Sequence, residues 1–374
     1  MTGSPANLSS LATSAQPGSA LIVVTRRIGD VLLATAVIRS LKEAWPDTAL
    51  DVLVFEGTEG VVTANPDVRR VLTVPERPRF GEHVRLYSRL FRRYGLALSL
   101  VPGDRPTLYA FVAGRRRLGL LLDTRKEAWK RCLLDRWVRF DDLDTHTVRM
   151  NLALVEALGV TPRTEVVVSW SDSDESRVDE LLGARSGRPL AVLHPYPKFN
   201  YKMWRGAGWA DVARCLADRG YQIVMTGSAD PAETSYTATL AADLPAGVAN
   251  VSGKLTLGGT ACLLSRAAIY IGPDTVTTHM SAALGVPTVA LFGPSNPVKW
   301  GPLPKGHPYD HNPWRRVGSG RVGNVFLVQG PGACVPCLLE GCDRRTESYS
   351  DCLLTLPAEG VIAAVDSLLE GPSP

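Results

Sequence analysis

A polar stretch between two apolar runs carries the strongest chemical signal in the sequence. "IYIGPDTVTTHMSAALGVPTVALFGP", residues 269–294, sets Asp274, Thr275 and His279 between two runs that are typical of β-strands. The first-turn N–H groups of the helix expected after Thr275, with the positive end of its dipole, favour a phosphate. His279 can donate to a diphosphate oxygen. A structural alternative also fits, in which Asp274 caps the helix and His279 is a packed surface histidine.

Lys202, in "NYKMWR", follows another expected strand. A mobile ammonium at the end of such a strand can neutralise a departing diphosphate. In most proteins, however, a lysine in a loop is only a solvated charge. Lys198 and Arg205, on either side of Lys202, are further cations that can share this work.

Strands and helices that alternate along the chain must position these residues. "LIVV" at 21–24 is followed by the helical pattern of "GDVLLATAVIRSLKEAWP" and by a strand, "ALDVLVF", at 49–55. "LAVLHPY" at 190–196, "WADVARCLADRG" at 209–220 and "YQIVMTGS" at 221–228 repeat this order. The alternation predicts an α/β fold with parallel sheets, and the series is too long for one sheet. We therefore expect two doubly wound domains.

Composition suggests where the parts of the chain begin and end. With 374 residues, 45% hydrophobic and 21% charged, the chain is typical of a soluble globular protein without a membrane-spanning segment. Residues 1–20 carry no charge, which predicts a flexible tail and not a secretory signal. We expect an N-terminal domain at 21–170 and a C-terminal domain at 171–374. The latter includes a Cys-rich loop at 330–352 and a final helix at 357–370.

The net charge of +4 is unevenly distributed. Residues 21–170 contain 24 Lys and Arg against 18 Asp and Glu, whereas residues 171–374 contain 17 against 19. In "VRLYSRLFRRYG", at 84–95, the apolar residues keep a helical spacing that leaves most arginines on other faces. This pattern fits a solvated helix face, or a surface for a phosphorylated acceptor or membrane headgroups. We expect no nucleic-acid partner, because no nucleic-acid-binding motif accompanies the charge.

Three motifs in order resemble glycosyltransferase family 9, the bacterial heptosyltransferases. They are "RRIGDVLLATAVIRSLKEAWPD" at 26–47, "HPYPKFNYKMWRGAGWADVARCLADRGYQIVMTGSADPAE" at 194–233 and "GPDTVTTHMSAALGVPTVALFGPSNPVKWGP" at 272–302. The resemblance implies a GT-B architecture, in which two Rossmann-like domains face a central cleft. It also implies an ADP-heptose donor held mainly by the C-terminal domain, an acceptor held mainly by the N-terminal domain, and inversion at the anomeric carbon.

The resemblance further implies roles for single residues in the N-terminal domain. Asp30, in a Gly-Asp-Val loop, matches the base that takes the proton of the acceptor hydroxyl. A competing role for Asp30 is the N-cap of a helix beginning at Val31. Arg26 and Arg27, just before it, are candidates for holding a carboxylate or phosphate of the acceptor.

For the C-terminal domain, the resemblance implies a set of donor-binding residues. Glu233 matches a carboxylate that contacts the ribose, and Leu255 matches a wall of the adenine pocket, although a core leucine fits as well. Lys202 and the run from Asp274 and Thr275 to His279 match the groups that hold the diphosphate and sugar. Val276 stands where the family usually has glycine, a departure that bears on the identity of the donor sugar.

Four cysteines near the C-terminus form the pattern C-x2-C-x4-C-x9-C. They are Cys334, Cys337, Cys342 and Cys352. Four thiolates at this spacing can close a structural zinc or iron site, and ordinary reduced cysteines are the alternative. The resemblance implies that catalysis itself requires no metal or other cofactor.

We therefore expect an enzyme, a metal-independent inverting heptosyltransferase acting on the lipopolysaccharide inner core. It would work in the cytoplasm, either free or as a peripheral protein on the inner face of the inner membrane. One alternative keeps the chemistry but uses a protein acceptor, as in autotransporter heptosylation. Another is a GT-B-like nucleotide-sugar epimerase or a binding protein.

Overall fold

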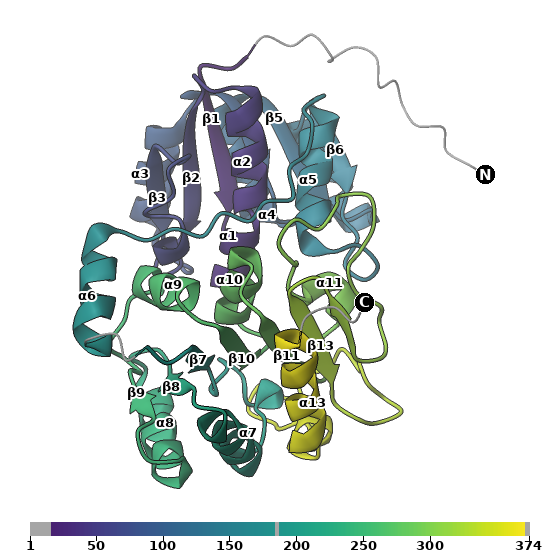
Figure 1. The fold of residues 1–374 in the computed structure, drawn as a ribbon. Helices are drawn as coiled ribbons and strands as arrows, with labels where there is room; N and C mark the ends of the chain where they lie inside the picture. The colour runs from purple at the N-terminus through teal and green to yellow at the C-terminus, as the bar shows by residue number, and fades with distance from the viewer. Residues whose placement is uncertain (1–15, 184–186, 371–374) are drawn as a thin grey trace. The chain divides into compact units, whose positions relative to one another are not determined.

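The computed structural model describes residues 16–183 and 187–370. The chain divides into two compact units, Met1–Val167 with Pro308–Asp310, and Val168–His307 with His311–Pro374 (Figure 1). Most of the flexible tail expected at 1–20 lies outside the described residues. Its last two positions are not a tail, because the first strand begins at Ser19. Among the described residues, no helix is both long and apolar enough to cross a bilayer.

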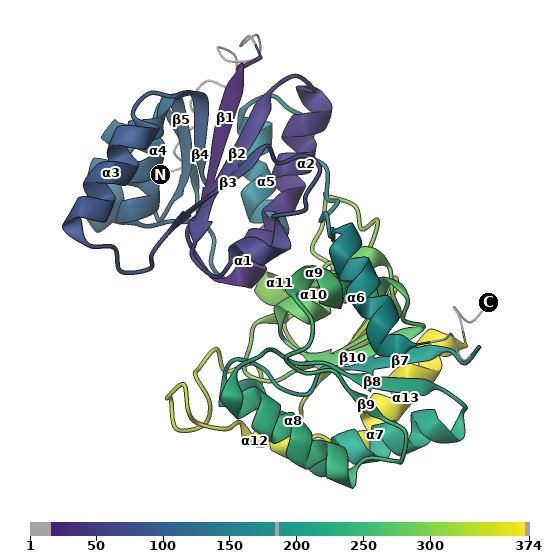
Figure 2. The same ribbon diagram turned by 90° about the vertical axis from the view of Figure 1, so that its left-hand side faces the viewer.

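A six-stranded parallel sheet forms the centre of unit 1, in the order β3-β2-β1-β4-β5-β6. Its elements are β1 (Ser19–Val24), α1 (Ile28–Leu33), α2 (Thr35–Ala44), β2 (Ala49–Phe55), η1 (Glu59–Val61), β3 (Arg70–Val74), α3 (Phe80–Leu90), β4 (Tyr94–Ser99), α4 (Asp104–Ala113), β5 (Gly114–Leu121), η2 (Arg125–Leu133), β6 (Arg136–Arg139) and α5 (Thr147–Ala157). Helices α3 and α4 cover one face of the sheet, and α2 and α5 cover the other (Figure 2).

Alternating side chains of β1 explain why both faces of this sheet are covered. Leu21 and Val23 point to the side of α3 and α4, where they pack with Leu90 and Tyr109. Ile22 points to the opposite face and is also fully buried. A strand that is apolar on both faces requires helices on both sides, as in doubly wound folds.

Unit 2 is built around a seven-stranded sheet in the order β12-β13-β11-β10-β7-β8-β9, parallel except for β12. Its elements are α6 (Asp172–Leu182), β7 (Leu190–Leu193), η3 (Asn200–Lys202), α7 (Gly206–Asp218), β8 (Gln222–Met225), α8 (Pro231–Asp243), β9 (Ala249–Asn250), α9 (Leu257–Ser265), β10 (Ile269–Pro273), α10 (Val276–Leu284), β11 (Thr288–Phe292), α11 (Pro297–Trp300), β12 (Gly320–Val322), β13 (Val325–Gln329), α12 (Asp351–Leu354) and α13 (Ala358–Leu369).

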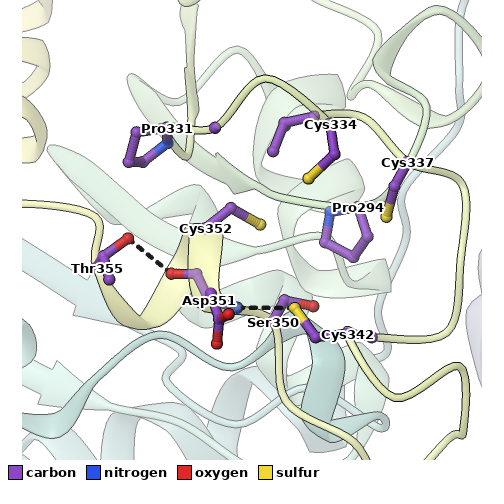
Figure 3. A pocket seen from close by; sticks show the side chains of 12 residues that line it. Pro294, Pro331, Cys334, Cys337, Cys342, Ser350, Asp351, Cys352 and Thr355 are labelled. Carbon is purple, nitrogen blue, oxygen red and sulfur yellow. Dashed lines mark hydrogen bonds between the residues drawn. The ribbon is translucent and has the colours of Figure 1, made fainter.

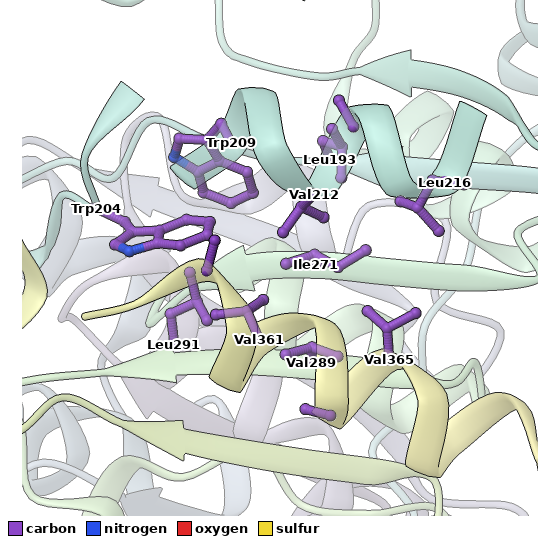
Figure 4. Close-up of a cluster of buried hydrophobic side chains, with 14 of the residues drawn as sticks. Leu193, Trp204, Trp209, Val212, Leu216, Ile271, Val289, Leu291, Val361 and Val365 are labelled. Atoms are coloured by element: carbon purple, nitrogen blue, oxygen red, sulfur yellow. The ribbon is translucent and has the colours of Figure 1, made fainter. Parts of the chain in front are cut away.

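Helices α7 and α13 bury their apolar sides on one face of this sheet (Figure 4). Val212 and Leu216 of α7 and Val361 of α13 pack over strand residues that include Ile271.

The strand order of each sheet reverses at one point. In unit 1 the chain starts at β1 and moves first to β2, then returns to β4 on the other side. In unit 2 it starts at β7, moves to β8, and returns to β10. At such a switch point, loops leave the carboxyl ends of neighbouring strands in opposite directions, so a ligand can bind between them. The candidate residues of both units follow these strands.

Candidate active site

Buried tryptophan holds the loop that follows β7 in unit 2. Trp204 is 1% exposed, its indole N–H donates to the Leu356 carbonyl (3.0 Å), and its ring meets that of Trp209 edge-on at 5.1 Å. A Cβ at position 208 would lie 2.3 Å from the Trp204 ring, so only glycine fits there. Lys202, two residues before this anchor, is therefore held in place by the core.

Lys202 forms an ion pair with Asp274, which follows the neighbouring strand β10. The distance from Nζ to Oδ2 is 2.5 Å, and Nζ is 3.4 Å from the Asp274 carbonyl. Burial alone would raise the pKa of Asp274, but the charge of Lys202 and hydrogen bonds from Lys202 and Ser295 outweigh it. The pKa of this carboxyl therefore lies below its usual value, and Asp274 is a carboxylate at neutral pH.

The start of α10 is not capped by Asp274. The N-cap residue is Thr275, which has an extended backbone and makes no side-chain cap, while the Asp274 carboxylate turns to Lys202. The structural alternative, in which Asp274 only caps the helix, is therefore wrong. The first-turn N–H groups of α10, which begins at the half-buried Val276, lack a side-chain cap and can bind an anion.

His279 is a buried residue of the first turn of α10, not a surface histidine. It is 6% exposed, and its Nε2 lies 4.0 Å from Oδ1 of Asp274. Burial lowers the pKa of His279 to about 4, so the ring is neutral at pH 7. Nδ1 is buried and has no hydrogen-bond partner within the described part of the chain. A buried ring nitrogen without a protein partner can bind a ligand atom.

His194 belongs to the same sheet edge, although the sequence patterns assign it no role. It follows β7, and its backbone N–H donates to the Ile271 carbonyl of β10 (3.0 Å). Its Nδ1 lies 3.1 Å from the Thr226 hydroxyl, which donates to the Leu193 carbonyl (3.3 Å). Because that hydroxyl has one proton, Nδ1 is the donor and Nε2 of His194 is an acceptor.

The neutral state of His194 preserves this acceptor. Burial lowers the pKa of His194 to about 4, so Nε2 keeps its lone pair at pH 7. A histidine within the apolar run "LAVLHPY", which predicts a strand at 190–196, was the signal in the sequence. Its tautomer depends on Thr226, 32 positions away, which no local pattern reveals.

Glu233 lies in the first turn of α8, which follows β8. It is 7% exposed, accepts a hydrogen bond from the Ser228 hydroxyl, and has a pKa raised by burial. A Cβ at Gly227 would lie 2.9 Å from Glu233 Oε1, so glycine keeps this approach open. Leu255 is half-buried just before α9, where its side chain would touch a Cβ at Gly259 (3.1 Å).

In unit 1, Asp30 follows β1 at the switch point of the sheet. Helix α1 begins at Ile28, so Asp30 lies within its first turn, and the competing prediction that Asp30 is an N-cap is wrong. The side chain is about one-tenth exposed, and Oδ2 lies 3.6 Å from Nε of Arg26. Arg27 is exposed and is the N-cap residue of α1.

The four C-terminal cysteines line a pocket of about 330 Å³, formed mainly by the loop that follows β13 and by α12 (Figure 3). All are free thiols. A tetrahedral site requires sulfurs within about 2.3 Å of one metal ion, and no group of three or more His, Cys, Asp or Glu in the described residues is so arranged. The structure therefore does not support the first of the two alternatives, a structural zinc or iron site, because the thiols line a cavity instead of meeting at a point.

Unit 2 thus brings together Lys202, Asp274 and the start of α10. Glu233 follows strand β8 of the same sheet, and Leu255 lies just before α9. Asp30, Arg26 and Arg27 form a separate group in unit 1. Chemically, the first group can bind an anion such as a diphosphate, and the second supplies a carboxylate beside a cation.

Comparison with known proteins gives these groups a family. Residues 107–310 match the model of glycosyltransferase family 9 (heptosyltransferase). The chain is 26% identical to lipopolysaccharide heptosyltransferase 3 of Escherichia coli, over 91% of this chain and 96% of that protein.

Solved structures share the fold. The glycosyl transferase family 9 protein of Veillonella parvula is 20% identical with a TM-score of 0.76, covering 94% of this chain and 97% of that one. The E. coli ADP-heptose lps heptosyltransferase II is 20% identical with a TM-score of 0.70, covering 94% and 98%. The expected α/β fold class, two Rossmann-like doubly wound domains of the GT-B type, is confirmed. The chain belongs to glycosyltransferase family 9, the heptosyltransferases.

Proposed function

We propose that this protein is an inverting glycosyltransferase that moves heptose from ADP-heptose to a hydroxyl of the lipopolysaccharide inner core. The observation that carries the proposal is the Lys202–Asp274 ion pair beside the uncapped start of α10, in a chain of this family. The similar E. coli proteins are named as lipopolysaccharide and ADP-heptose heptosyltransferases, which supports this choice of donor and acceptor.

Donor binding follows from the charges of unit 2. Lys202 and the first-turn N–H groups of α10 bind the diphosphate, with His279 close by as a neutral donor. Asp274 then accepts hydrogen bonds from heptose hydroxyls, while Thr275 and Val276 contact the sugar and phosphate. Glu233 accepts from the ribose hydroxyls, and Leu255 packs on the adenine.

Transfer requires one base and a stabilised leaving group. Asp30 takes the proton of the acceptor hydroxyl, and the oxygen attacks the anomeric carbon from the face opposite the diphosphate. The bond from that carbon to the diphosphate oxygen breaks, and its electron pair stays on ADP. Lys202 and the α10 dipole stabilise the negative charge that develops there, a role that needs no resident metal ion. Arg26 and Arg27 hold carboxylates or phosphates of the acceptor.

The acceptor determines where the enzyme works. A lipopolysaccharide core precursor is anchored in a bilayer by its lipid, so the protein would act in the cytoplasm as a peripheral protein on the inner face of the inner membrane. The proposal includes no nucleic-acid partner.

Calorimetric titration with ADP, UDP, GDP and ADP-heptose tests the donor. ADP compounds should bind at least tenfold more tightly than UDP or GDP, and a preference for UDP would overturn the assignment. Incubation with ADP-heptose and a lipid-free, Kdo-containing core acceptor should then yield a product whose anomeric configuration, read by NMR, is inverted. Labelled heptose that enters protein instead of this acceptor would support the protein heptosyltransferase.

A further inference from the structure

A row of apolar side chains on α3 is exposed to solvent. Phe80 is 85% exposed, Val84 51% and Phe91, directly after the helix, 66%. Together with Tyr87 they follow the spacing 4, 3, 4, which keeps them on one side of a helix. Single exposed apolar residues are ordinary, but a row of them indicates an interaction surface.

The same row is tied to the core, so it is a rigid part of unit 1. Tyr87 is half-buried and its ring lies 5.7 Å from that of Tyr109 of α4. Leu90 is 1% exposed and belongs to the core of the sheet. At the C-terminal end, the Arg92 backbone N–H donates to the Val112 carbonyl of α4 (2.8 Å). Helix α3 therefore has one face in the core and another face in solvent.

Arginines next to this row carry positive charge that the protein leaves uncompensated. Arg85, Arg89, Arg92 and Arg93 are exposed, and within the described residues none of them forms an ion pair. Several other basic residues of unit 1 are paired instead. Arg69 and Arg70 contact Asp51, Arg117 contacts Asp135, and Lys130 contacts Asp104 and Glu127.

The single acid within α3 does not change this balance. The Glu82 carboxylate accepts from the Arg79 backbone N–H (2.7 Å) at the start of the helix, and Arg77 and Arg79 are exposed as well. Residues 77–93 thus combine six arginines and a single acid with exposed aromatic side chains.

We propose that α3 and its flanks, residues 77–93, form the surface by which this protein lies on an anionic membrane. The inference rests on the proposed function, since a lipid-anchored acceptor requires an enzyme at the bilayer. Phenylalanine and valine side chains enter the boundary between headgroups and acyl chains, while arginines bind lipid phosphates. A bilayer fits better than a protein partner, because it offers negative charge along the whole helix.

Vesicle sedimentation with the full chain tests this surface. The wild-type protein should bind vesicles of phosphatidylglycerol and phosphatidylethanolamine, and not vesicles of phosphatidylcholine alone. Each arginine near an anionic surface strengthens binding roughly fivefold at low salt. The variant R85Q/R89Q/R92Q/R93Q should therefore bind at least a hundredfold more weakly. The variant F80S/V84S/F91S should bind about tenfold more weakly. Its remaining binding should still decrease with added salt, because its arginines are intact.

A matched control removes equal charge and an equally exposed apolar group from unit 2. The variant R214Q/R315Q/R344Q/R345Q/V317S changes only exposed residues and should bind anionic vesicles like the wild type. Equal melting temperatures would show that all variants fold. The proposal is overturned if the wild type does not sediment with anionic vesicles, or if the control loses as much binding as the α3 variants.

Activity separates this surface from the acceptor site and from the proposed function. On a lipid-free acceptor, both α3 variants should turn over like the wild type. On the same acceptor in anionic vesicles they should lose at least tenfold. A loss on the lipid-free acceptor would assign the arginines to acceptor binding and overturn the membrane surface. Vesicle binding by a wild-type chain that transfers no heptose would instead refute the function and leave the surface standing.

Discussion

The Lys202 ammonium lies 2.5 Å from Oδ2 of Asp274, and the two residues follow neighbouring strands on either side of the switch point in unit 2. Their side chains are 18% and 8% exposed. Without a ligand, each compensates the buried charge of the other. A diphosphate that binds Lys202 thus competes with an internal acid, while Asp274 becomes available to sugar hydroxyls.

Replacing Lys202 by methionine should weaken ADP binding by roughly 10- to 100-fold. A hydrogen bond to a charged group contributes about 1.5–3 kcal/mol, and methionine keeps the length of the side chain without its charge. Calorimetric titration measures the change. Lys198→Met is the control, because Lys198 is exposed and lies over the Phe199 ring. Equal losses of ADP affinity in the two variants would show that ADP binding depends on net charge and not on the position of Lys202.

The same variant should be less stable, in a way that depends on pH. Removing one partner of a buried ion pair costs about 3–5 kcal/mol. In the wild type, the lowered pKa of Asp274 contributes stability above the unfolded value, and this contribution is lost as pH falls through the folded pKa. Without Lys202, burial raises the pKa of Asp274, so the deficit should shrink on acidification. Urea unfolding at pH 7 and pH 5 measures this, and K202M/D274N should recover stability without recovering ADP binding.

Asp30→Asn should reduce turnover without affecting the donor. General bases contribute typically 10²–10⁴-fold, and asparagine keeps the shape of the side chain but accepts no proton. The Kd for ADP should stay within twofold, because Asp30 belongs to unit 1 and Lys202 to unit 2. Steady-state kinetics and calorimetry measure both. Asp47→Asn, at an exposed position of the same unit, should leave turnover unchanged, and an unchanged kcat in Asp30→Asn would remove Asp30 as the base.

The sequence predicted the features of this site that depend on local patterns, and it missed those that depend on contacts between residues far apart in the chain. The strand-helix-strand order indicated both doubly wound units, because alternating apolar patterns are local. The helical pattern after Gly29 was expected to be continuous, but it breaks at Ala34 between α1 and α2. There the Thr35 hydroxyl donates to the Leu32 carbonyl and accepts from the Val167 N–H, 132 positions away. Helix ends set by such tertiary contacts cannot be located from local propensity.

The same limit explains the misassigned caps. Asp30 and Asp274 both precede apolar helical patterns, which is the usual N-cap signal. In the structure Arg27 and Thr275 occupy the cap positions, while the two acids face cations. An aspartate that is spared from capping is available for chemistry, and only its partners reveal this.

His194 should serve the donor site as a hydrogen-bond acceptor. Glutamine can place an amide oxygen near the position of Nε2, whereas asparagine reaches only the position of Nδ1. His194→Asn should therefore lower ADP-heptose affinity about tenfold, and His194→Gln should retain most of it. Titration at pH 7 measures this, where the pKa of about 4 keeps the histidine neutral. If the two variants lose equal affinity for ADP-heptose and have equal melting temperatures, Nε2 of His194 does not accept a hydrogen bond from the donor. His311→Asn, at an exposed position, is the control.

Glu233→Gln should remove discrimination at the ribose. A carboxylate accepts from a vicinal diol more strongly than an amide, so the wild type should prefer ADP over 2′-deoxy-ADP about tenfold. The variant should bind the two nucleotides within twofold of each other. Burial raises the pKa of Glu233. The wild-type affinity for ADP should therefore fall as the pH decreases and Glu233 becomes protonated. Glu340→Gln, at an exposed position, should keep both the preference and its pH dependence.

Cys352 should be the least reactive thiol of the C-terminal pocket. Burial, with three neighbouring cysteines, raises the pKa of Cys352 to about 11, whereas Cys334 and Cys342 are exposed. At pH 8 a thiol of pKa 11 is about one-thousandth ionised, although its thiolate is a stronger nucleophile. Iodoacetamide labelling followed by mass spectrometry should therefore find Cys352 modified at least tenfold more slowly than either exposed thiol. Protection of Cys334 and Cys342 that a chelator abolishes would contradict this, because it would mean that a metal ion draws the thiols together in the pocket.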